Sequence, residues 1–483
     1  MKLKELCLSA DIYCPDTKGN IEITQVTCDS RRVTSGGLFV CLSGKRNDGE
    51  KYCEEAIKNG AAAIIHTSAE YGELYSDDNR LALSRLCRKM YGEGIEKLKL
   101  VAVTGTNGKT TVTELLRNIF TEAGHRCATV GTLGIRTPSG MLENVNMTTP
   151  DPEELYKALA EIAKQGCEYV FIEASSHALA LKKLDALRFE LGIFTNLTRD
   201  HLDFHLTEKE YFEAKRRLVG LSKRIITNTD TKHGREFCEN ALTCSQNTEA
   251  DFTATNVKYG IDGVSYTLNQ SIDIKCHIPG RFTVMNSLEA AAAALTLGVT
   301  PTHIQKALLA STAVPGRLER VELPESADVS VFIDYAHTPD ALENLLLSVR
   351  DLAKGRRIVL VFGCGGDRDR GKRKLMGAVA TKYADFTVVT SDNPRSEEPR
   401  DIIREILKGI DKEKRYAVIE KRLDAIRYVI EESRSGDVII LAGKGHEKYE
   451  IDKNGRHDFD EAEAVRKAWT EYEGNTRKPK NKS

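Results

Sequence analysis

The segment VAVTGTNGKTT, residues 101–111, combines the residue types that bind a nucleotide phosphate. An apolar run leads into Gly105 and Gly108, which allow the backbone to turn tightly. Lys109 and Thr110 then open a helical pattern. Backbone N–H groups at such a turn hold phosphate oxygens, a lysine neutralises the terminal phosphates, and a threonine hydroxyl binds magnesium. The segment therefore predicts a nucleotide site.

Other residues could complete this site, and each also has an ordinary structural explanation. Glu173 ends a buried strand, where it and Thr110 could hold a magnesium ion, although an acid at a strand end often only caps a helix. His201 falls in a loop, where a histidine is more often a plain hydrogen-bonding residue. The turn departs from the general P-loop pattern at Val103, where that pattern has a glycine. It indicates a nucleotide but not a reaction.

The elements around this turn alternate as they do in α/β proteins. A boundary is expected near Lys97, because a strand begins abruptly after it and leads into the glycine-rich turn. Strand-like and helix-like segments then alternate as far as Asn228, which is typical of a parallel sheet with crossover helices. Residues 251–280 change to alternating residues and turn signals, which predict a small antiparallel appendage. An alanine-rich helix and a shorter helix ending near Ser311 follow.

A second boundary is expected in the turn at 313–317, after which the alternation starts again. The fold expected is α/β with three domains: an N-terminal domain, a central P-loop-type ATPase domain whose parallel sheet carries the antiparallel appendage, and a C-terminal Rossmann-like domain. The predicted divisions are 1–97, 98–315 and 316–474, followed by a disordered basic tail over 475–483.

Composition excludes several classes of protein. The length of 483 residues suits about three domains, and 70 Lys+Arg against 71 Asp+Glu leave a net charge of −1, with no basic excess for a nucleic acid or an anionic membrane surface. No apolar run approaches the ~20 residues that span a bilayer, and the N-terminal MKLKELCLSADIYCPD lacks the apolar stretch of a signal peptide. The twelve cysteines form no C-x-x-C pair, so we expect reduced, largely buried thiols in a cytoplasmic protein.

Longer strings narrow the function. TGTNGKT, EASSHAL at 173–179, FTNLTRDHLDFH at 194–205 and DYAHTPDALE at 334–343 resemble the Mur ligases of peptidoglycan synthesis and, less closely, folylpolyglutamate synthetase. The similarity extends over nearly the whole chain. CDSRRV, GGLFVCLSGKRNDGEKY, GCGGDRDRGKRKLMG, TSDNPRSEEPRD and AGKGHEKYE are similar to the branch of the family that adds meso-diaminopimelate to UDP-N-acetylmuramoyl-L-alanyl-D-glutamate.

The resemblance implies a ligase that uses ATP and Mg²⁺ and activates the γ-carboxylate of D-Glu as an acyl phosphate, which the incoming amine then attacks. Such chemistry needs two anions neutralised more than it needs a protein nucleophile. The implied catalytic residues are Lys109, Glu173, His201 and Lys215, and the implied magnesium-binding residues are Thr110, Glu173, His201 and Lys215.

Lys215 matches a lysine that the family carries as a carbamate, which turns a cation into an anion. Forming a carbamate requires the neutral amine, and the adjacent Arg216 and Arg217 are expected to favour that form by like-charge repulsion. The alternative is an ordinary solvated lysine on a helix.

The resemblance also implies the nucleotide-binding residues, which come from the turn, the alanine-rich helix, the second boundary and the DYAH segment: Gly105, Thr106, Asn107, Gly108, Lys109, Thr110, Thr111, Asn286, Arg317, Asp334, Tyr335 and His337. An arginine at a domain boundary could couple ATP binding to domain closure. Closure matters because water destroys an acyl phosphate in an open site.

For the UDP-sugar dipeptide, the residues that match the family's binding segments are Ser30, Asn146, Thr148, Thr149, Ser175 and Lys183. Three nearby positions depart from the common pattern: Met147 is often Asn, Leu181 is often Gln, and Lys183 is often Arg. Lys183 can meet a phosphate as a point charge but lacks the bidentate fork of arginine, and Asn146 could replace the missing amide.

The motif DNPR at 392–395 is implied to select the incoming amino acid. Meso-diaminopimelate has a second carboxylate that lysine lacks, and an arginine can hold it with two parallel charge-assisted hydrogen bonds. Lysine would leave Arg395 unpaired, and in a buried site this would cost about 2–5 kcal/mol of binding free energy. The implied residues for this substrate are Arg368, Asp392, Asn393, Pro394, Arg395, Gly443 and Glu447, with Glu447 facing the distal ammonium.

Alternatives remain open at this point. The same ligase could add L-lysine or ornithine, and folylpolyglutamate synthetase would share the central chemistry but lack CDSRRV and DNPR. A nucleotide-gated binding protein without ligase activity is disfavoured by the intact Lys109, Glu173, His201 and Lys215. We expect a monomer with no nucleic-acid or membrane partner.

Overall fold

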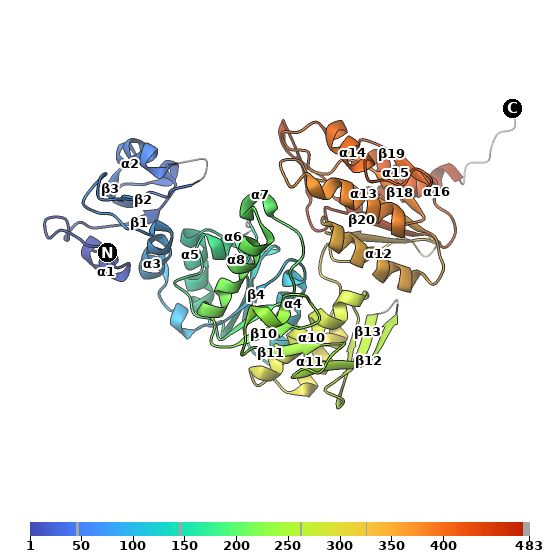
Figure 1. Cartoon of the computed structure of the whole chain (residues 1–483), viewed down its shortest axis with the longest axis horizontal. Helices are drawn as coiled ribbons and strands as arrows, with labels where there is room; N and C mark the ends of the chain where they lie inside the picture. Colours follow the sequence, from blue (N-terminus) through green and yellow to red (C-terminus); the bar gives the residue numbers. More distant parts are fainter. Residues whose placement is uncertain (45–47, 144–146, 261–262, 325, 477–483) are drawn as a thin grey trace.

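The computed structural model describes residues 1–44, 48–143, 147–260, 263–324 and 326–476. The described chain forms three units in a row, each built on its own sheet, with the N-terminal unit at one end and the C-terminal unit at the other (Figure 1). The predicted α/β class and the parallel-rich central and C-terminal sheets are confirmed. No described helix is both long enough and apolar enough to traverse a bilayer.

The N-terminal unit has a parallel sheet of order β1-β2-β3. Its strands are β1 (Gln25–Thr27), β2 (Gly37–Val40) and β3 (Ala61–Ile65), its helices are α1 (Leu3–Ser9), α2 (Cys53–Lys58) and α3 (Asn79–Tyr91), and its 3₁₀ turns are η1 (Ser30–Arg32), η2 (Gly49–Tyr52) and η3 (Ile95–Lys97). Apolar side chains of this unit and of one side of the central unit form a single core cluster. The two units therefore share a hydrophobic core.

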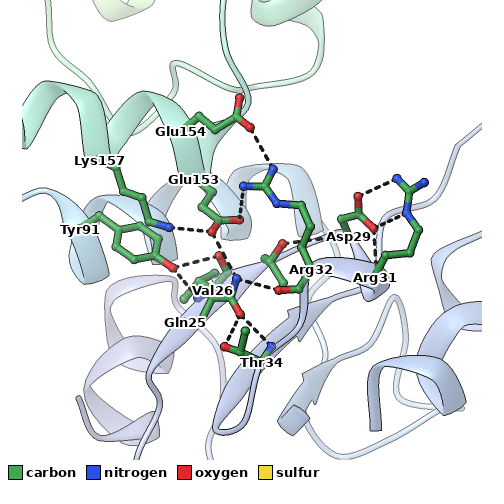
Figure 2. Close-up of polar contacts among 11 residues, drawn as sticks. Gln25, Val26, Asp29, Arg31, Arg32, Thr34, Tyr91, Glu153, Glu154 and Lys157 are labelled. Carbon is green, nitrogen blue, oxygen red and sulfur yellow. Dashed lines mark hydrogen bonds and ion pairs between the residues drawn. The ribbon is translucent and has the colours of Figure 1, made fainter. Parts of the chain in front are cut away.

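Polar contacts at the border of that core fix the N-terminal unit on helix α5 (Pro152–Lys164) of the central unit (Figure 2). The Arg32 guanidinium lies 2.9 Å from a carboxylate oxygen of Glu154. Glu153 accepts hydrogen bonds from Gln25 (3.3 Å) and Lys157 (2.8 Å). These contacts set the angle at which β1 and η1 meet the central unit.

The central unit has an eleven-stranded sheet of order β14-β13-β12-β11-β10-β9-β4-β8-β5-β6-β7. The strands are β4 (Lys99–Thr104), β5 (Cys127–Gly131), β6 (Gly134–Thr137), β7 (Gly140–Glu143), β8 (Tyr169–Glu173), β9 (Leu191–Phe194), β10 (Ile225–Asn228), β11 (Leu242–Ser245), β12 (Phe252–Gly260), β13 (Gly263–Leu268) and β14 (Ile272–Cys276). In the order of the sheet, the run β12-β11-β10-β9-β4-β8-β5 pairs in parallel. The pairs at the two ends, β14-β13-β12 and β5-β6-β7, are antiparallel. The predicted appendage is present, but it extends the main sheet because β12 pairs with β11. The β6–β7 hairpin was not predicted.

Helices cover both faces of this sheet, as a parallel sheet requires. They are α4 (Lys109–Glu122), α5, α6 (Ser176–Ala180), α7 (Leu202–His205), α8 (Glu208–Leu221), α9 (Gly234–Phe237), α10 (Arg281–Thr296) and α11 (Pro301–Ala310). Helices α4, α10 and α11 enclose one core cluster together with the antiparallel strands β12, β13 and β14. The alanines at 290–294 are fully buried, which lets α10 pack closely on α4 and on the sheet.

The C-terminal unit has a six-stranded sheet of order β15-β16-β20-β17-β18-β19, parallel except for β15. Its strands are β15 (Glu319–Val321), β16 (Ser330–Asp334), β17 (Ile358–Phe362), β18 (Phe386–Val389), β19 (Tyr416–Val418) and β20 (Val438–Ala442), with a separate hairpin of β21 (Tyr449–Asp452) and β22 (Gly455–Asp458). Helices α12 (Pro339–Ala353), α13 (Gly371–Tyr383), α14 (Pro399–Leu407), α15 (Arg422–Glu431) and α16 (Glu461–Thr476) cover it. Helix α16 runs two residues into the segment predicted as a tail, and residues 477–483 lie outside the described chain.

Candidate functional site

Most of the predicted site residues of the central and C-terminal units lie at the carboxyl ends of neighbouring parallel strands. In the central sheet, the glycine-rich turn follows β4, Glu173 ends β8, and the loop to His201 follows β9, and these three strands are adjacent. In the C-terminal sheet, DYAH, GCGGDRD, TSDNPR and GKGHE begin at or directly after β16, β17, β18 and β20. Ligands of open α/β sheets bind at such edges.

The glycine-rich turn needs glycine at two positions for steric reasons. Gly105 has φ 151°, and a Cβ there would come within 1.9 Å of the Thr195 hydroxyl oxygen. Gly108 has φ 90°, and a Cβ there would come within 2.6 Å of the side-chain oxygen of Asn286. The close approach places Asn286, from α10, directly against the turn.

Lys109 begins helix α4 and folds back over the turn. Its Nζ donates hydrogen bonds to the carbonyl oxygens of Gly105 and Thr106, both at 2.9 Å. Burial lowers the pKa of Lys109, and the carboxylate of Glu173 acts in the opposite direction. The ammonium is therefore held beside the turn, where a phosphate would both approach it and favour its charge.

Glu173 is 2% exposed and is surrounded by donors. Its carboxylate accepts hydrogen bonds from the Thr110 hydroxyl (3.0 Å), the Thr132 backbone N–H (2.9 Å) and the Thr132 hydroxyl (3.0 Å). Burial raises the pKa of Glu173. A hydroxyl and a carboxylate oxygen beside the glycine-rich turn match the ligand preference of Mg²⁺. Thr132 was not predicted, although its position directly after β5 places it at the same sheet edge.

Lys215 on α8 is 1% exposed, which excludes the solvated helix lysine considered from the sequence. Its Nζ donates to the Gly105 carbonyl oxygen at 2.8 Å and lies 4.4 Å from the centre of the Tyr211 ring. Burial, followed by repulsion from Lys109, lowers the pKa of Lys215 well below its usual value. The neutral amine that a carbamate requires is therefore favoured.

The expected cause of that neutral amine was wrong. Arg216 lies 3.8 Å from the carboxylate of Glu213, and Arg217 donates to the Leu179 carbonyl oxygen at 2.9 Å. Both guanidinium groups are thus engaged away from Lys215, because neighbours in sequence on a helix point in different directions. The pKa of Lys215 is lowered by burial and by Lys109, and not by the two arginines as expected from the sequence.

His201 precedes α7 with φ 54°, and its Nε2 lies 3.3 Å from Asp200. Burial lowers the pKa of His201 to about 3 against the opposing charge of Asp200, with smaller lowering contributions from His177 and Lys215, so the ring is neutral and can accept a cation. Asp200 also approaches the C-terminal unit, where His337 Nε2 is 3.8 Å away. The loop after β9 therefore touches both units.

In the C-terminal unit, Asp334 organises the backbone. Its carboxylate accepts hydrogen bonds from the N–H groups of Leu318 (2.7 Å) and Ala336 (2.8 Å), and burial raises the pKa of Asp334. The Arg317 guanidinium lies 4.7 Å from the centre of the Tyr335 ring. His337 Nδ1 donates to the Tyr335 carbonyl oxygen at 2.8 Å. The segment at 313–317 and the DYAH segment are therefore joined at the border between the two units.

A cavity of about 440 Å³ lies between the turn, α10 and α12. Its walls include Asn107, Gly108, Thr111, Asn286, Arg317 and Asp334 of the predicted nucleotide set. Wall residues that the sequence did not point out include Asn196, Asn228, Asp230, Gln246, Phe282 and Asp340. The Asn107 amide lies 3.4 Å from the Asp340 carboxylate, across the border of the two units. The volume is in the range of small-molecule sites.

The residues predicted for the UDP-sugar dipeptide lie in two places. The Thr149 hydroxyl donates to the Glu173 carbonyl oxygen (2.7 Å) and accepts from the Ser175 N–H (3.1 Å), and the Thr148 hydroxyl lies 3.3 Å from that of Thr132. Ser30 is in η1 of the N-terminal unit, where its hydroxyl donates to Glu55.

Lys183 Nζ lies 2.7 Å from Asp151, 3.4 Å from the Thr149 carbonyl oxygen and 3.8 Å from the Met147 sulfur. Two of the three unusual positions therefore touch each other. Leu181 caps the C-terminus of α6. Asn146 lies outside the described residues.

The DNPR motif is held by a network at the carboxyl edge of the C-terminal sheet. The Asn393 side chain donates to Glu447 (2.7 Å) and accepts from Lys444 (2.9 Å) and from the Ile451 N–H (2.9 Å). Burial raises the pKa of Glu447. Lys444 is fully buried and was not among the predicted residues.

Three loops meet at this network. Arg395 has φ 53°, and its guanidinium donates to the Gly366 carbonyl oxygen at 2.9 Å. A Cβ on Gly443 would come within 2.5 Å of the Asp392 carboxylate, so this glycine allows the two loops to approach closely. Pro394 is buried beside Arg395, and Arg368 is exposed on the third loop.

A buried ion pair lies next to the DNPR network, at the end of β20. Arg422 on α15 is 1% exposed, and its Nε lies 2.6 Å from the carboxylate of Glu461 at the start of α16. Its Nη2 donates to the Ala442 carbonyl oxygen at 2.9 Å, directly before Gly443. The helices α15 and α16 are thereby fixed to the end of β20.

Comparisons with known proteins agree with this arrangement. Three family models match the chain: "Mur ligase family, catalytic domain" over residues 22–86, "Mur ligase middle domain" over 103–294, and "Mur ligase, glutamate ligase domain" over 316–445.

Curated relatives match over nearly their whole length. A protein of Syntrophomonas wolfei named UDP-N-acetylmuramoyl-L-alanyl-D-glutamate--2,6-diaminopimelate ligase is 42% identical over 480 residues, covering 95% of this chain and 97% of its own. A protein of the same name from Clostridioides difficile is 41% identical over 481 residues, covering 96% and 99%. A solved structure of a ligase of that name superposes with a TM-score of 0.68 at 32% identity, covering 98% of this chain and 99% of its own.

Proposed function

Because the chain belongs to the Mur ligase family, we propose that it is the ATP-dependent ligase that joins meso-diaminopimelate to UDP-N-acetylmuramoyl-L-alanyl-D-glutamate in peptidoglycan precursor synthesis. The observation that carries this proposal is the meeting of two sheet edges. The turn after β4, with Lys109 and Glu173, faces the border with the C-terminal unit, and the DNPR network lies at the carboxyl edge of that unit. A phosphate site and an amino-acid site of this kind are what amide ligation needs.

The bound ATP would occupy the cavity beside the turn, with its terminal phosphates at Lys109 and at the N-terminus of α4. Thr110 and Glu173 fit magnesium because they offer a hydroxyl and a carboxylate oxygen, and a carbamate on Lys215 would add further oxygen ligands. His201 would add a neutral imidazole beside this oxygen set. Magnesium, when bound, would neutralise charge between the phosphate oxygens and the substrate carboxylate.

The proposed reaction proceeds in two steps. An oxygen of the D-Glu γ-carboxylate attacks the γ-phosphorus of ATP, and ADP leaves. The amine of the incoming amino acid then attacks the acyl carbon, and inorganic phosphate leaves. Lys109 and the backbone N–H groups of the turn stabilise charge on the transferred phosphoryl group, and contact between the two units at Asp200 and His337 limits the access of water.

Lys215 would enter this chemistry as a carbamate. Its neutral amine adds to carbon dioxide and loses a proton, which gives an anionic carbamate in place of the usual lysine ammonium. The Tyr211 ring and the Gly105 carbonyl oxygen hold its amine in place. All twelve cysteines are free, which suits a reducing compartment, and we assign the reaction to the cytoplasm.

Phosphate release tests the proposed reaction. With ATP, magnesium and the UDP-sugar dipeptide, we expect release only when meso-diaminopimelate is added, measured by a coupled phosphate assay with the tripeptide product identified by mass spectrometry. If no phosphate is released with either meso-diaminopimelate or L-lysine, the ligase assignment is overturned. Release with L-lysine or ornithine alone would overturn only the choice of amino acid.

The substitution Arg395→Ala tests the proposed carboxylate contact. We expect KM for meso-diaminopimelate to rise by about 30-fold or more, because a charge-assisted bidentate contact contributes about 2 kcal/mol or more, whereas KM for ATP stays within about twofold. Steady-state kinetics with each substrate varied in turn measure both values. Arg400→Ala is the matched control, since that guanidinium is exposed and pairs only with Glu420 among the described residues. Equal losses for both substrates would point to a folding defect instead.

A further inference from the structure

A second group of metal-binding residue types lies in the N-terminal unit, apart from the site described above. We infer that Cys41, Glu50, Cys53 and His66 form a binding site for a zinc ion. One ligand atom from each residue lies within 4.8 Å of every other: two thiol sulfurs, a carboxylate oxygen and an imidazole nitrogen. The ligation reaction proposed above uses none of these four residues.

The fold brings the four residues together from separate segments. Cys41 directly follows β2 and His66 directly follows β3, and these parallel strands are neighbours, so both residues emerge at the same sheet edge. Glu50 lies in η2, and Cys53 begins α2. The chain folds back so tightly that a Cβ on Gly49 would come within 2.9 Å of the Cys41 Cα. The return of the chain places Glu50 and Cys53 over the end of β2.

The distances are close to those of a tetrahedral zinc site. The two sulfurs are 3.4 Å apart, the Cys53 sulfur is 3.6 Å from the Glu50 carboxylate, and His66 Nδ1 is 2.7 Å from the same carboxylate oxygen. Zinc holds sulfur at about 2.3 Å and nitrogen or oxygen at about 2.0–2.2 Å, which separates its ligand atoms by roughly 3.3–3.8 Å. Shifts of roughly half an ångström would therefore let an ion bind at the centre of the cluster.

Hydrogen bonds and packing around the four residues also hold them in position, as in established metal sites. The second oxygen of Glu50 accepts hydrogen bonds from the Thr67 N–H (2.7 Å) and the Thr67 hydroxyl (2.8 Å). A Cβ on Gly72 would lie 2.5 Å from the His66 ring, so the far side of the ring is packed and Nδ1 faces the cluster. The buried Asn79 amide donates to the carbonyl oxygens of Cys41 (2.6 Å) and His66 (3.0 Å).

The donor set selects the metal. Two thiolates with an imidazole and a carboxylate suit zinc, whereas magnesium and calcium take oxygen ligands. A disulfide between Cys41 and Cys53 is the competing use of the two sulfurs. It would involve neither the carboxylate of Glu50 nor the imidazole of His66, and both groups are turned to the same point as the sulfurs.

A bound ion would have a structural effect on α2. Cys53 is the first residue of this helix, and Glu55, two residues further on, accepts the hydrogen bond from Ser30. Zinc would fix the start of α2 and, through Glu55, the position of η1. Only this last link depends on the proposed substrate site, because the zinc site itself is defined by its own four residues.

Cobalt titration of the reduced, metal-free full-length protein tests the inference, with Co²⁺ and Zn²⁺ alone as probes. We expect one equivalent of Co²⁺ to give the strong visible bands of a tetrahedral site with thiolate charge transfer, and Zn²⁺ to displace it. Cys53→Ser and His66→Ala should each weaken binding by at least about 100-fold, since losing a ligand costs more than losing an outer partner. Cys14→Ser, a partly buried cysteine of the same unit outside the cluster, should leave the spectrum unchanged.

Three results would overturn the inference. The first is a tetrahedral spectrum that persists in both ligand variants, and the second is no such spectrum from protein whose Cys41 and Cys53 are shown to be reduced by thiol labelling. The third is a Cys41–Cys53 disulfide recovered by peptide mapping of protein purified without an oxidant. Circular dichroism checks the fold of each variant, and Glu50→Gln replaces Cys53→Ser if that variant does not fold. None of these readouts is ligase activity, so the proposed function and the zinc site fail independently.

Discussion

Replacing Lys109 with methionine is expected to lower kcat for ligation by about 100- to 1000-fold or more, because the ammonium beside the turn stabilises charge on the transferred phosphoryl group. Methionine keeps much of the side-chain volume and removes only the charge and its two hydrogen bonds to the turn. KM for the UDP-sugar dipeptide should change little, because Lys109 contacts the turn rather than the residues proposed to hold the sugar. Initial rates of phosphate release at saturating substrates measure the change.

Lys99→Met is the matched control for this substitution. Lys99 is exposed at the start of β4, the strand that leads into the turn, where its Nζ lies 3.3 Å from the Tyr169 hydroxyl. Its replacement should leave kcat within about twofold. A Lys109→Met protein that is folded, binds ATP and retains more than about a tenth of the normal kcat would contradict the assigned role of this lysine.

Breaking the buried ion pair between Arg422 and Glu461 is expected to have the largest effect on stability. Glu461→Ala leaves the guanidinium buried and without its charged partner, for which about 3–5 kcal/mol of unfolding free energy is typical. Urea unfolding followed by the fluorescence of Trp469 measures the loss. That tryptophan is the single one in the sequence, and it is buried on the same helix, α16.

A double substitution distinguishes the loss of the pair from the exposure of one unpaired charge. Arg422→Met with Glu461→Leu should recover most of the lost stability, because neither side chain then buries a charge. Glu471→Ala, which removes an exposed partner of Arg427, should change the unfolding free energy by less than about 0.5 kcal/mol. A double variant as unstable as Glu461→Ala would show that the helix contacts, rather than the charge, account for the effect.

The same ion pair has a functional consequence. Because Arg422 also holds the carbonyl group directly before Gly443, we expect Glu461→Ala to raise KM for the amino acid even where the protein remains folded. The double variant should restore stability more completely than KM, since it cannot restore that hydrogen bond.

The sequence was sufficient for features that depend on neighbouring residues. The buried strand segments LVAV (100–103) and YVFI (169–172) are continuous apolar runs, and the turn at Gly105 and Gly108 is a local pattern, so both could be predicted. Their shared sheet edge then followed from the rule that parallel strands point the same way. This rule accounts for the meeting of Glu173 with Thr110.

Features that depend on tertiary packing were missed. The β6–β7 and β21–β22 hairpins are short and carry no strong alternating pattern, so their pairing was not predicted. Lysine and arginine are usually exposed, and the complete burial of Lys444 and Arg422 depends on partners far away in sequence. Arg216 and Arg217 illustrate the opposite error, since adjacency in sequence was taken as proximity in space.

The cysteines show the same limit. Spacing alone argued against a metal site, because no two cysteines form a C-x-x-C pair. The structure brings Cys41 and Cys53 to 3.4 Å by reversing the chain between them and adds His66 from the neighbouring strand. A site assembled across two strands and a returning loop leaves no short motif for sequence reasoning to find.

The two borders of the central domain differ in chemistry, and this difference determines which domain can move. The N-terminal domain is joined to it by a continuous apolar core. Among the described residues, the contacts of the C-terminal domain with the central domain include the ion pairs Arg281–Asp351 and Arg199–Asp369, the polar contacts Asn107–Asp340 and Asp200–His337, and the apolar side chain of Phe282.

Opening an apolar core exposes a large area to water, whereas exchanging ion pairs for hydrated ions changes the free energy little. The first two domains are therefore expected to behave as one rigid body. For the proposed reaction, release of ADP and product would then require a rotation of the C-terminal domain about the non-helical link at 311–318. Higher ionic strength, which weakens the ion pairs of that border, is expected to make this rotation easier.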